Sequence, residues 1–183
     1  MKHYIDILIK PDAEMPLNVL LNTVYTKFHK ALCDLSSKNI GVSFPKYNVT
    51  LGNILRIHGS VEDVASLKAD NWLGGMNGYC VISDITPVPG DTKFRTVSRK
   101  QITMTQSKLK RLIKRGSIPE EEVKQYKAKM FSQGLDNPYL ELQSSSNGHK
   151  HRRYIEFGDL KTVPVAGSFD CFGLSKQATV PWF

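Results

Sequence analysis

The chain opens with apolar residues at alternate positions and then changes to apolar residues at helical spacing. Isoleucine at every second position gives residues 3–9 one apolar face and predicts a strand there. Between Leu17 and Leu35 the apolar residues recur at intervals of three and four, which predicts a helix with one buried face.

Three more segments are rich in β-forming residues and predict strands, and a second helix is predicted between the last two. These segments are 40–44, 53–58 and 79–85. Ser60 and Asp63 resemble a capping box and predict a short helix that continues through Leu67. The resulting order of strand, helix, strand, strand, helix, strand is typical of a ferredoxin-like unit, so the α+β class is expected.

The run Pro87-Val88-Pro89-Gly90 is a plausible domain boundary. We therefore expect a ferredoxin-like domain over 1–90 and a second α+β domain over 91–183. Within the second domain, residues 107–115 and a segment that starts at Pro119 and ends before Gly134 are predicted to be helical.

Two β-rich runs, 140–146 and 149–157, flank Asn147-Gly148, the preferred dipeptide of a tight hairpin turn. In an idealised two-residue hairpin Ser144 pairs with His151 and Ser146 pairs with His149, all on one face. A last β-rich stretch is predicted over 168–175, ahead of the apolar end Val180-Pro181-Trp182-Phe183.

Composition narrows the class of protein. Hydrophobic residues make up 40% and charged residues 23% of the 183 residues, as in ordinary globular proteins. No apolar run approaches the roughly 18–20 residues that span a bilayer, and the first residues lack the pattern of a signal peptide. Cys33, Cys80 and Cys171 are odd in number and far apart, which favours reduced intracellular thiols over disulfides or zinc ligands.

Positive charge is concentrated in one segment. Lys and Arg outnumber Asp and Glu by 25 to 17. Nine basic residues and no acid lie between Lys93 and Arg115: Lys93, Arg95, Arg99, Lys100, Lys108, Lys110, Arg111, Lys114 and Arg115. A solvated surface normally mixes both signs, so this run points to phosphate groups.

The helix predicted over 107–115 separates apolar and basic side chains. Leu109, Leu112 and Ile113 cluster on one side, and the basic residues occupy the opposite arc. The helix lacks the Trp or Phe that anchors a membrane-surface helix, so nucleic-acid phosphates are the favoured partner over a membrane. A plain soluble surface helix is the alternative.

The five histidines differ in setting. His3 and His58 lie in strand-like segments and are most simply structural. His29 flanks the apolar stripe of its helix, where an imidazole is expected to be accessible as a proton acceptor; an ordinary half-exposed histidine is the alternative. His149 and His151 share a strand face with no third metal ligand nearby, and the acids form no two-metal set, so no metal or other cofactor is expected.

Several motifs together resemble the CRISPR repeat-cleaving endoribonucleases of the I-F subtype over nearly the whole chain. The motifs are His3-Tyr4-Ile5-Asp6, Lys27-Phe28-His29-Lys30-Ala31-Leu32, Ile40-Gly41-Val42-Ser43-Phe44-Pro45, Val97-Ser98-Arg99-Lys100-Gln101, Gly173-Leu174-Ser175-Lys176 and Val180-Pro181-Trp182-Phe183. Their common order and spacing carry the resemblance.

The resemblance implies a ferredoxin-like domain followed by a domain that lays a basic helix into the groove of a repeat RNA hairpin. It implies that His29 and Ser144 are catalytic. It also implies RNA contacts by Arg99, Gln101, Lys108, Lys110, Arg111, Lys114, Arg115, Ser146, Asn147, His151 and Phe172, in which Arg99 and Gln101 read bases of the lower stem.

Two positions depart from the family. Phe172 stands where a tyrosine is usual near the active site, and His151 replaces an aromatic residue that stacks on a nucleotide. The groove helix is also richer in lysine, which binds phosphate without bidentate geometry.

On this basis the expected function is metal-independent cleavage at the 3′ base of the repeat stem. The substrate's 2′-hydroxyl would attack the phosphate, with His29 as general base and Ser144 holding the ribose, to give 2′,3′-cyclic phosphate and 5′-hydroxyl ends. The protein is expected to be cytoplasmic, to keep its guide RNA and to join the other subunits of a CRISPR effector complex. A non-catalytic hairpin-binding subunit is the alternative, and a DNA-binding regulator is a third.

Overall fold

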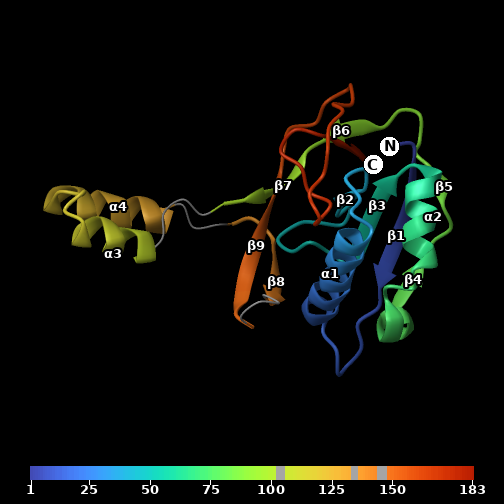
Figure 1. The fold of residues 1–183 in the computed structure, drawn as a ribbon, viewed down its shortest axis with the longest axis horizontal. Helices are drawn as coiled ribbons and strands as arrows, with labels where there is room; N and C mark the ends of the chain where they lie inside the picture. Colours follow the sequence, from blue (N-terminus) through green and yellow to red (C-terminus); the bar gives the residue numbers. More distant parts are fainter. Residues whose placement is uncertain (102–105, 133–135, 144–147) are drawn as a thin grey trace.

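The computed structural model describes residues 1–101, 106–132, 136–143 and 148–183 (Figure 1). The first half forms an antiparallel sheet in the order β2-β3-β1-β4, with β5 also paired to β1. Its strands are β1 (His3–Ile9), β2 (Gly41–Ser43), β3 (Ile54–Gly59), β4 (Cys80–Ile82) and β5 (Thr86–Pro87). This order agrees with the predicted ferredoxin-like pattern, and the predicted α+β class is confirmed.

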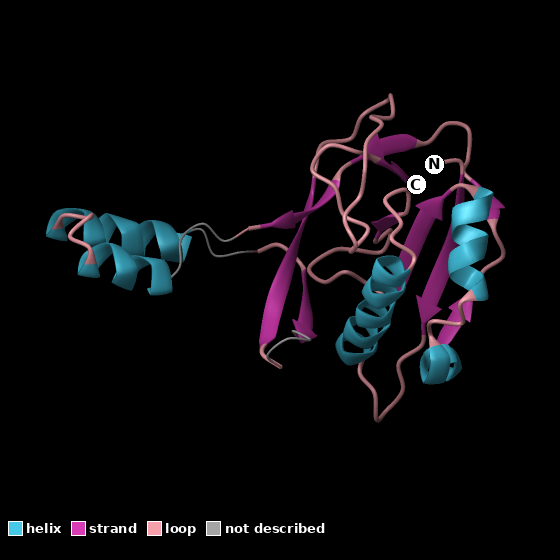
Figure 2. Cartoon of the chain, viewed as in Figure 1, coloured by secondary structure: helices cyan, strands magenta, loops and turns pink. Residues whose placement is uncertain are grey.

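Two helices lie along this sheet (Figure 2): α1 (Leu17–Asp34) and α2 (Val61–Ala69). The predicted apolar stripe of α1 is buried, and Tyr25 and Phe28 are fully enclosed. Ser60 caps α2 because its hydroxyl accepts a hydrogen bond from the Asp63 N–H, 3.1 Å long, as the capping box predicted. A 3₁₀ turn, η1 (Gly74–Tyr79), leads into β4, which is shorter than predicted.

A second sheet has the order β7-β9-β8 and consists of β7 (Val97–Lys100), β8 (Tyr139–Gln143) and β9 (Lys150–Phe157). The predicted hairpin is therefore present, but its predicted register is wrong because His151 pairs with Leu142 and not with Ser144. Strand faces alternate with a period of two, so the buried face fixes a register only to within two residues. Ser144 lies outside the described residues.

The predicted β-rich stretch over 168–175 is not a strand, and this prediction is wrong. The Asp170 carboxylate accepts hydrogen bonds of 2.9 Å from the backbone N–H groups of Phe172 and Leu174, and Gly173 has a φ of 68°. An Asp that binds the backbone two and four residues ahead favours a turn over a strand ladder. This turn, residues 170–174, is the segment that meets α1.

The chain ends in β10 (Val180–Trp182), which pairs with β6 (Lys93–Arg95). Arg95 lies over the Trp182 ring, 4.7 Å from its centroid, and donates a 2.9 Å hydrogen bond to the Gly158 carbonyl. Burying the guanidinium stem against aromatic rings gives this arginine a packing role. Arg95, one of the nine residues of the basic run, therefore holds β6 and β10, the two ends of the C-terminal half, together.

The two predicted helices of the basic region are present as α3 (Gln106–Lys114) and α4 (Glu120–Ser132). They form a helical pair set apart from the sheets (Figure 1). Within the described ranges, no helix combines the length and apolar character needed to cross a membrane.

The buried core is shared by both halves of the chain. It includes Ile5, Phe28 and Leu55 from the first half and Leu140 and Ile155 from the second. The domain boundary at residue 90 remains a prediction.

Candidate active site

His29 lies in the last third of α1, half-buried at the edge of the apolar stripe. Its Nδ1 is 2.7 Å from the carbonyl oxygen of Cys171, in the turn of residues 170–174. A carbonyl oxygen only accepts hydrogen bonds, so the proton of the neutral imidazole lies on Nδ1. Nε2 is then left with a lone pair, the state that a general base requires.

The ring of Phe172 lies parallel to that of His29, with 3.5 Å between the centroids and 9° between the planes. The guanidinium carbon of Arg153 is also 3.5 Å from the centroid of Phe172. Two groups this close to one centroid occupy opposite faces of the ring. Phe172 therefore separates the imidazole from the guanidinium, which keeps the positive charge of Arg153 near His29 but out of contact with it.

Arg153 is a buried cation. It extends from β9 opposite Leu140, and desolvation lowers the pKa of its guanidinium, with the nearby charge of Arg99 adding to this effect. Its Nε is buried and has no hydrogen-bond partner among the described residues. A buried guanidinium nitrogen without a hydrogen-bond partner is costly, so this group is suited to an incoming anion.

His29 and Phe172 border an open cleft of about 520 Å³ between α1, the hairpin and the turn of residues 170–174. Its lining comprises Thr26, His29, Lys30, Cys33, Leu142, Gln143, His151 and Phe172. The hairpin is held against α1 by a 3.0 Å hydrogen bond from the Glu141 N–H to the Asn22 side-chain oxygen. The structure therefore brings two predicted site residues of the second half, His151 and Phe172, to His29.

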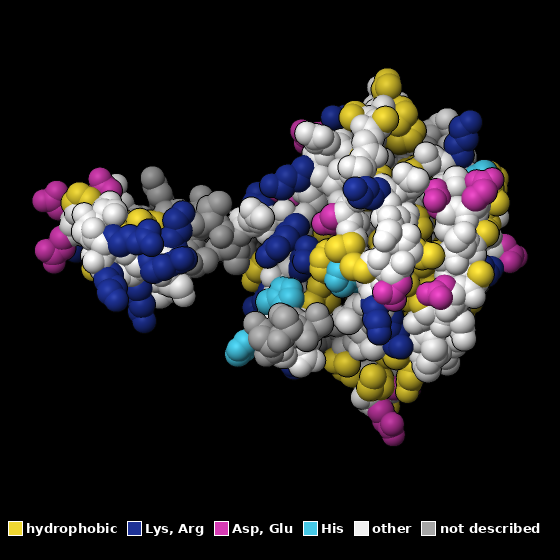
Figure 3. Space-filling model, in the orientation of Figure 1, with side chains coloured by type: hydrophobic (Ala, Val, Ile, Leu, Met, Phe, Trp, Pro, Cys, Tyr) yellow, Lys and Arg dark blue, Asp and Glu magenta, His cyan; other side chains and the backbone are white. Residues whose placement is uncertain are grey.

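Histidine and basic side chains gather on the face of the molecule that carries this hairpin (Figure 3). Ser144, Ser146 and Asn147 lie outside the described residues, so their predicted places in the site stay predictions.

Cys33 follows His29 by one helical turn, and its Sγ is 3.6 Å from His29 Nδ1. Desolvation, followed by a hydrogen bond with the Cys171 thiol, raises the pKa of Cys33 to about 11. Cys33 is therefore a neutral thiol near pH 7 and a poor nucleophile. All three cysteines are free.

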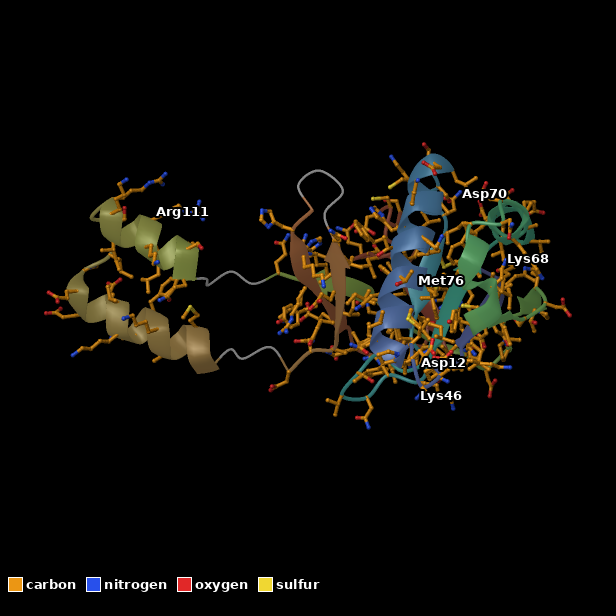
Figure 4. The ribbon with its side chains drawn as sticks, turned by 90° about the horizontal axis from the view of Figure 1, so that it is seen from below. Asp12, Lys46, Lys68, Asp70, Met76 and Arg111 are labelled. Atoms are coloured by element: carbon orange, nitrogen blue, oxygen red, sulfur yellow. The ribbon has the colours of Figure 1, made fainter. Side chains whose placement is uncertain are left out.

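The basic helix α3 presents its charges to solvent and buries Leu109. Its exposed cations are Lys108, Lys110, Arg111 and Lys114, and Arg115 follows directly after the helix. Figure 4 shows Arg111 on this helix, well away from α1. The structure does not bring these residues to the His29 cleft, so any contact they make with a long ligand is separate from it.

Arg99 and Gln101 lie exposed at the end of β7, where the chain leaves the sheet for the helical pair. Their neighbour Lys100 is engaged in an ion pair with Glu156 on β9. The predicted base-reading pair thus lies at the end of β7 that leads toward the helical pair (Figure 1).

Sequence reasoning missed two features of the site. The Cys171 carbonyl gave no signal because it is a backbone group, and no motif marked Arg153 as a site residue. The alternation of β9 offered one clue to Arg153, because it places this residue on the same inward face as the buried Ile155.

Comparison with known proteins shows which family this chain resembles. The model of the family described as CRISPR-associated protein (Cas_Csy4) matches residues 4–183. A protein of Escherichia coli (strain UTI89 / UPEC) named CRISPR-associated endonuclease Cas6/Csy4 is 39% identical and is matched over 100% of both chains. A protein of the same name from Pseudomonas aeruginosa (strain UCBPP-PA14) is 37% identical, also over 100% of both chains.

One solved structure is "Structure of Thermus Thermophilus Cse3 bound to an RNA representing a pre-cleavage complex". It has 9% identity and a TM-score of 0.36, with 99% of this chain and 100% of that chain covered. This likeness is too slight to bear on fold or function. The family match and the two full-length relatives show that this chain belongs to the Csy4 family of CRISPR-associated proteins, as its sequence motifs indicated.

Proposed function

We propose that the protein is an endoribonuclease that cleaves CRISPR repeat RNA at the 3′ base of its hairpin stem, without a metal ion. Two relatives of full length are named endonucleases, which supports the reaction class. The observation that carries the proposal is the hydrogen bond from His29 Nδ1–H to the Cys171 carbonyl, because it leaves Nε2 as a base at the edge of an open cleft.

In the proposed reaction the nucleophile belongs to the RNA. Nε2 of His29 takes the proton of the 2′-hydroxyl, whose oxygen then forms a bond to the adjacent phosphorus. The bond from phosphorus to the 5′-oxygen breaks, and that oxygen is protonated as it leaves. The products are a 2′,3′-cyclic phosphate and a 5′-hydroxyl, and no water is consumed.

The remaining roles follow from charge and position. Arg153, buried behind the ring of Phe172, supplies fixed positive charge for the phosphate as negative charge develops on it. His151 offers a ring for stacking on a nucleotide beside the cut. Ser144 is proposed to hold the ribose hydroxyl in line, and Ser146 and Asn147 to bind RNA near the cut.

Affinity and sequence reading are assigned to different elements. Side chains normally cannot read bases in the deep, narrow major groove of an RNA helix. The five cations of the α3 region therefore bind phosphates and supply affinity, whereas Arg99 and Gln101 read bases at the foot of the stem. We further propose that the protein stays on its guide RNA and joins a cytoplasmic effector complex.

A non-catalytic RNA-binding subunit is the second candidate. The observation that favours it is Phe172, which has no hydroxyl to offer to the reaction. Both candidates predict tight binding of the hairpin, and only the first predicts two product fragments.

The test uses purified protein with the repeat RNA of its own genome in excess EDTA. We expect one cut, with the cyclic phosphate identified by the mass of the 5′ fragment. Tight binding without cleavage, with or without added Mg²⁺, would establish the second candidate, and cleavage that needs Mg²⁺ would refute the metal-free reaction.

A further inference from the structure

Beside the proposed catalytic base lie two thiols, those of Cys33 and Cys171, that the reaction does not use. We propose that Cys33, Cys171 and His29 form a binding site for Zn²⁺, and that a bound ion stops RNA cleavage. The binding part stands by itself, while the inhibition rests on the proposed function.

The spacing of the three side chains fits one ion. The Sγ atoms of both cysteines and a ring nitrogen of His29 all lie within 4.8 Å of one another. Cys33 Sγ is 3.6 Å from His29 Nδ1. A tetrahedral zinc ion with usual bond lengths separates a sulfur and a nitrogen ligand by about 3.6 Å, so this pair needs almost no movement.

The donor set selects the metal. Two thiolates and one imidazole suit Zn²⁺ and other thiophilic ions, and they do not suit Mg²⁺ or Ca²⁺, which take oxygen ligands. Cys33 is exposed and lines the cleft, so an ion has a path to the site. Three protein ligands leave a fourth position for water or for an RNA oxygen.

Binding of the ion conflicts with the proposed role of His29. The ion takes the place of the proton on Nδ1, which moves to Nε2, and the hydrogen bond to the Cys171 carbonyl is lost. Two thiol protons also leave to solvent as the thiolates bind. With Nδ1 held by the ion, the imidazole no longer has the position that the carbonyl gave it. Nε2 now carries the proton, so it has no lone pair left to accept the proton of the 2′-hydroxyl. Cleavage is therefore expected to stop although RNA still binds through α3.

The binding arm uses Co²⁺ as a spectroscopic substitute for Zn²⁺, added to protein kept reduced with a phosphine. We expect one ion per chain, a thiolate-to-cobalt absorption band, and displacement of Co²⁺ by Zn²⁺. Cys33→Ala and Cys171→Ala should each weaken binding by more than the roughly 10–100-fold that loss of a supporting contact costs a metal site. Cys80→Ala is the matched control, since Cys80 is a free cysteine in β4 outside this group.

The cleavage arm measures the rate with Zn²⁺ and then with EDTA. We expect reversible inhibition of the wild type and of Cys80→Ala, and none for Cys33→Ala at the same Zn²⁺ concentration. A protein that shows the cobalt band but never cuts RNA would refute the proposed function and leave the metal site standing. Absence of the band, or equal Zn²⁺ affinity in all three variants, would overturn the metal site.

Discussion

His29 and Phe172 are 143 residues apart in the chain, yet their rings are parallel at 3.5 Å between centroids. The turn capped by Asp170 accounts for this arrangement. It presents the Cys171 carbonyl to His29 Nδ1 and the next side chain, Phe172, to the face of the imidazole. One short turn therefore fixes both the tautomer and the plane of the proposed base.

Removing the ring of Phe172 should reduce cleavage more than binding. Phe172→Leu frees the imidazole to tilt, and a misplacement of about 1 Å costs on the order of 10²-fold in rate. Single-turnover cleavage and equilibrium binding of the hairpin measure the two effects. Phe172→Tyr keeps the ring and should cut at close to the wild-type rate. A loss of rate in both variants would show that stacking of the Phe172 ring on His29 does not set the cleavage rate.

Local patterns predicted most of the elements correctly. The alternating isoleucines of β1 and the stripe of α1 each report a single buried face, and the Ser60 cap is a purely local bond. The turn of residues 170–174 was mistaken for a strand because its composition is β-rich. The two backbone hydrogen bonds that the Asp170 carboxylate accepts outweigh that preference.

The site depended on contacts that no local pattern encodes. His29 was placed correctly at the edge of its stripe, but its partner is a backbone carbonyl from the other end of the chain. Similarly, the run of basic residues without an acid looked uniform in sequence. In the structure Lys100 forms an ion pair with Glu156 on the neighbouring strand, and Arg95 is packed among aromatic rings.

Arginines of the helical pair and of β7 should differ in what they contribute. Arg111→Ala and Arg115→Ala should weaken hairpin binding and reduce its salt dependence by about one phosphate contact each. Arg99→Ala should instead lower discrimination at one base pair, by about 1–3 kcal/mol. Binding titrations at several salt concentrations, with matched and mismatched stems, separate the two. Equal losses on both stems for all three variants would contradict this division.

A buried histidine away from the cleft should make folding sensitive to acid. His58 is fully buried, its Nε2 is 2.8 Å from the Ser43 hydroxyl, and its Nδ1 has no hydrogen-bond partner among the described residues. Desolvation, with the charge of Arg56 in second place, holds the pKa of His58 well below 6.5. Below pH 6.5 the unfolded chain therefore binds a proton at His58 that the folded chain does not bind.

The free energy of unfolding should accordingly rise with pH up to about 6.5 and gain nothing more from this group above it. The slope from one proton is about 1.4 kcal/mol per pH unit. Urea unfolding at pH 5, 6, 7 and 8 measures it, and His58→Gln should reduce the slope between pH 5 and 6. His149→Gln, at an exposed position, is the control. An unchanged slope in His58→Gln would assign the acid sensitivity to other groups.

His29→Ala should abolish cleavage and leave hairpin affinity nearly intact. The side chain is half-buried at the edge of the core, so its removal opens no large cavity and the fold should persist. Loss of a general base typically costs ~10²–10⁴-fold in rate. The binding energy, by contrast, is expected to lie in the α3 region, which is set apart from α1 (Figure 1).

A substrate with a 2′-deoxy ribose at the cut should behave the same way with wild-type protein, bound but uncut, because the nucleophile is missing. Cleavage time courses and binding curves for both cases, with His3→Ala as the same change outside the cleft, complete the comparison. Normal cleavage by His29→Ala would remove this residue from the reaction. Efficient cutting of the deoxy substrate would exclude attack by the 2′-hydroxyl altogether, since no other group of the RNA can form the cyclic phosphate.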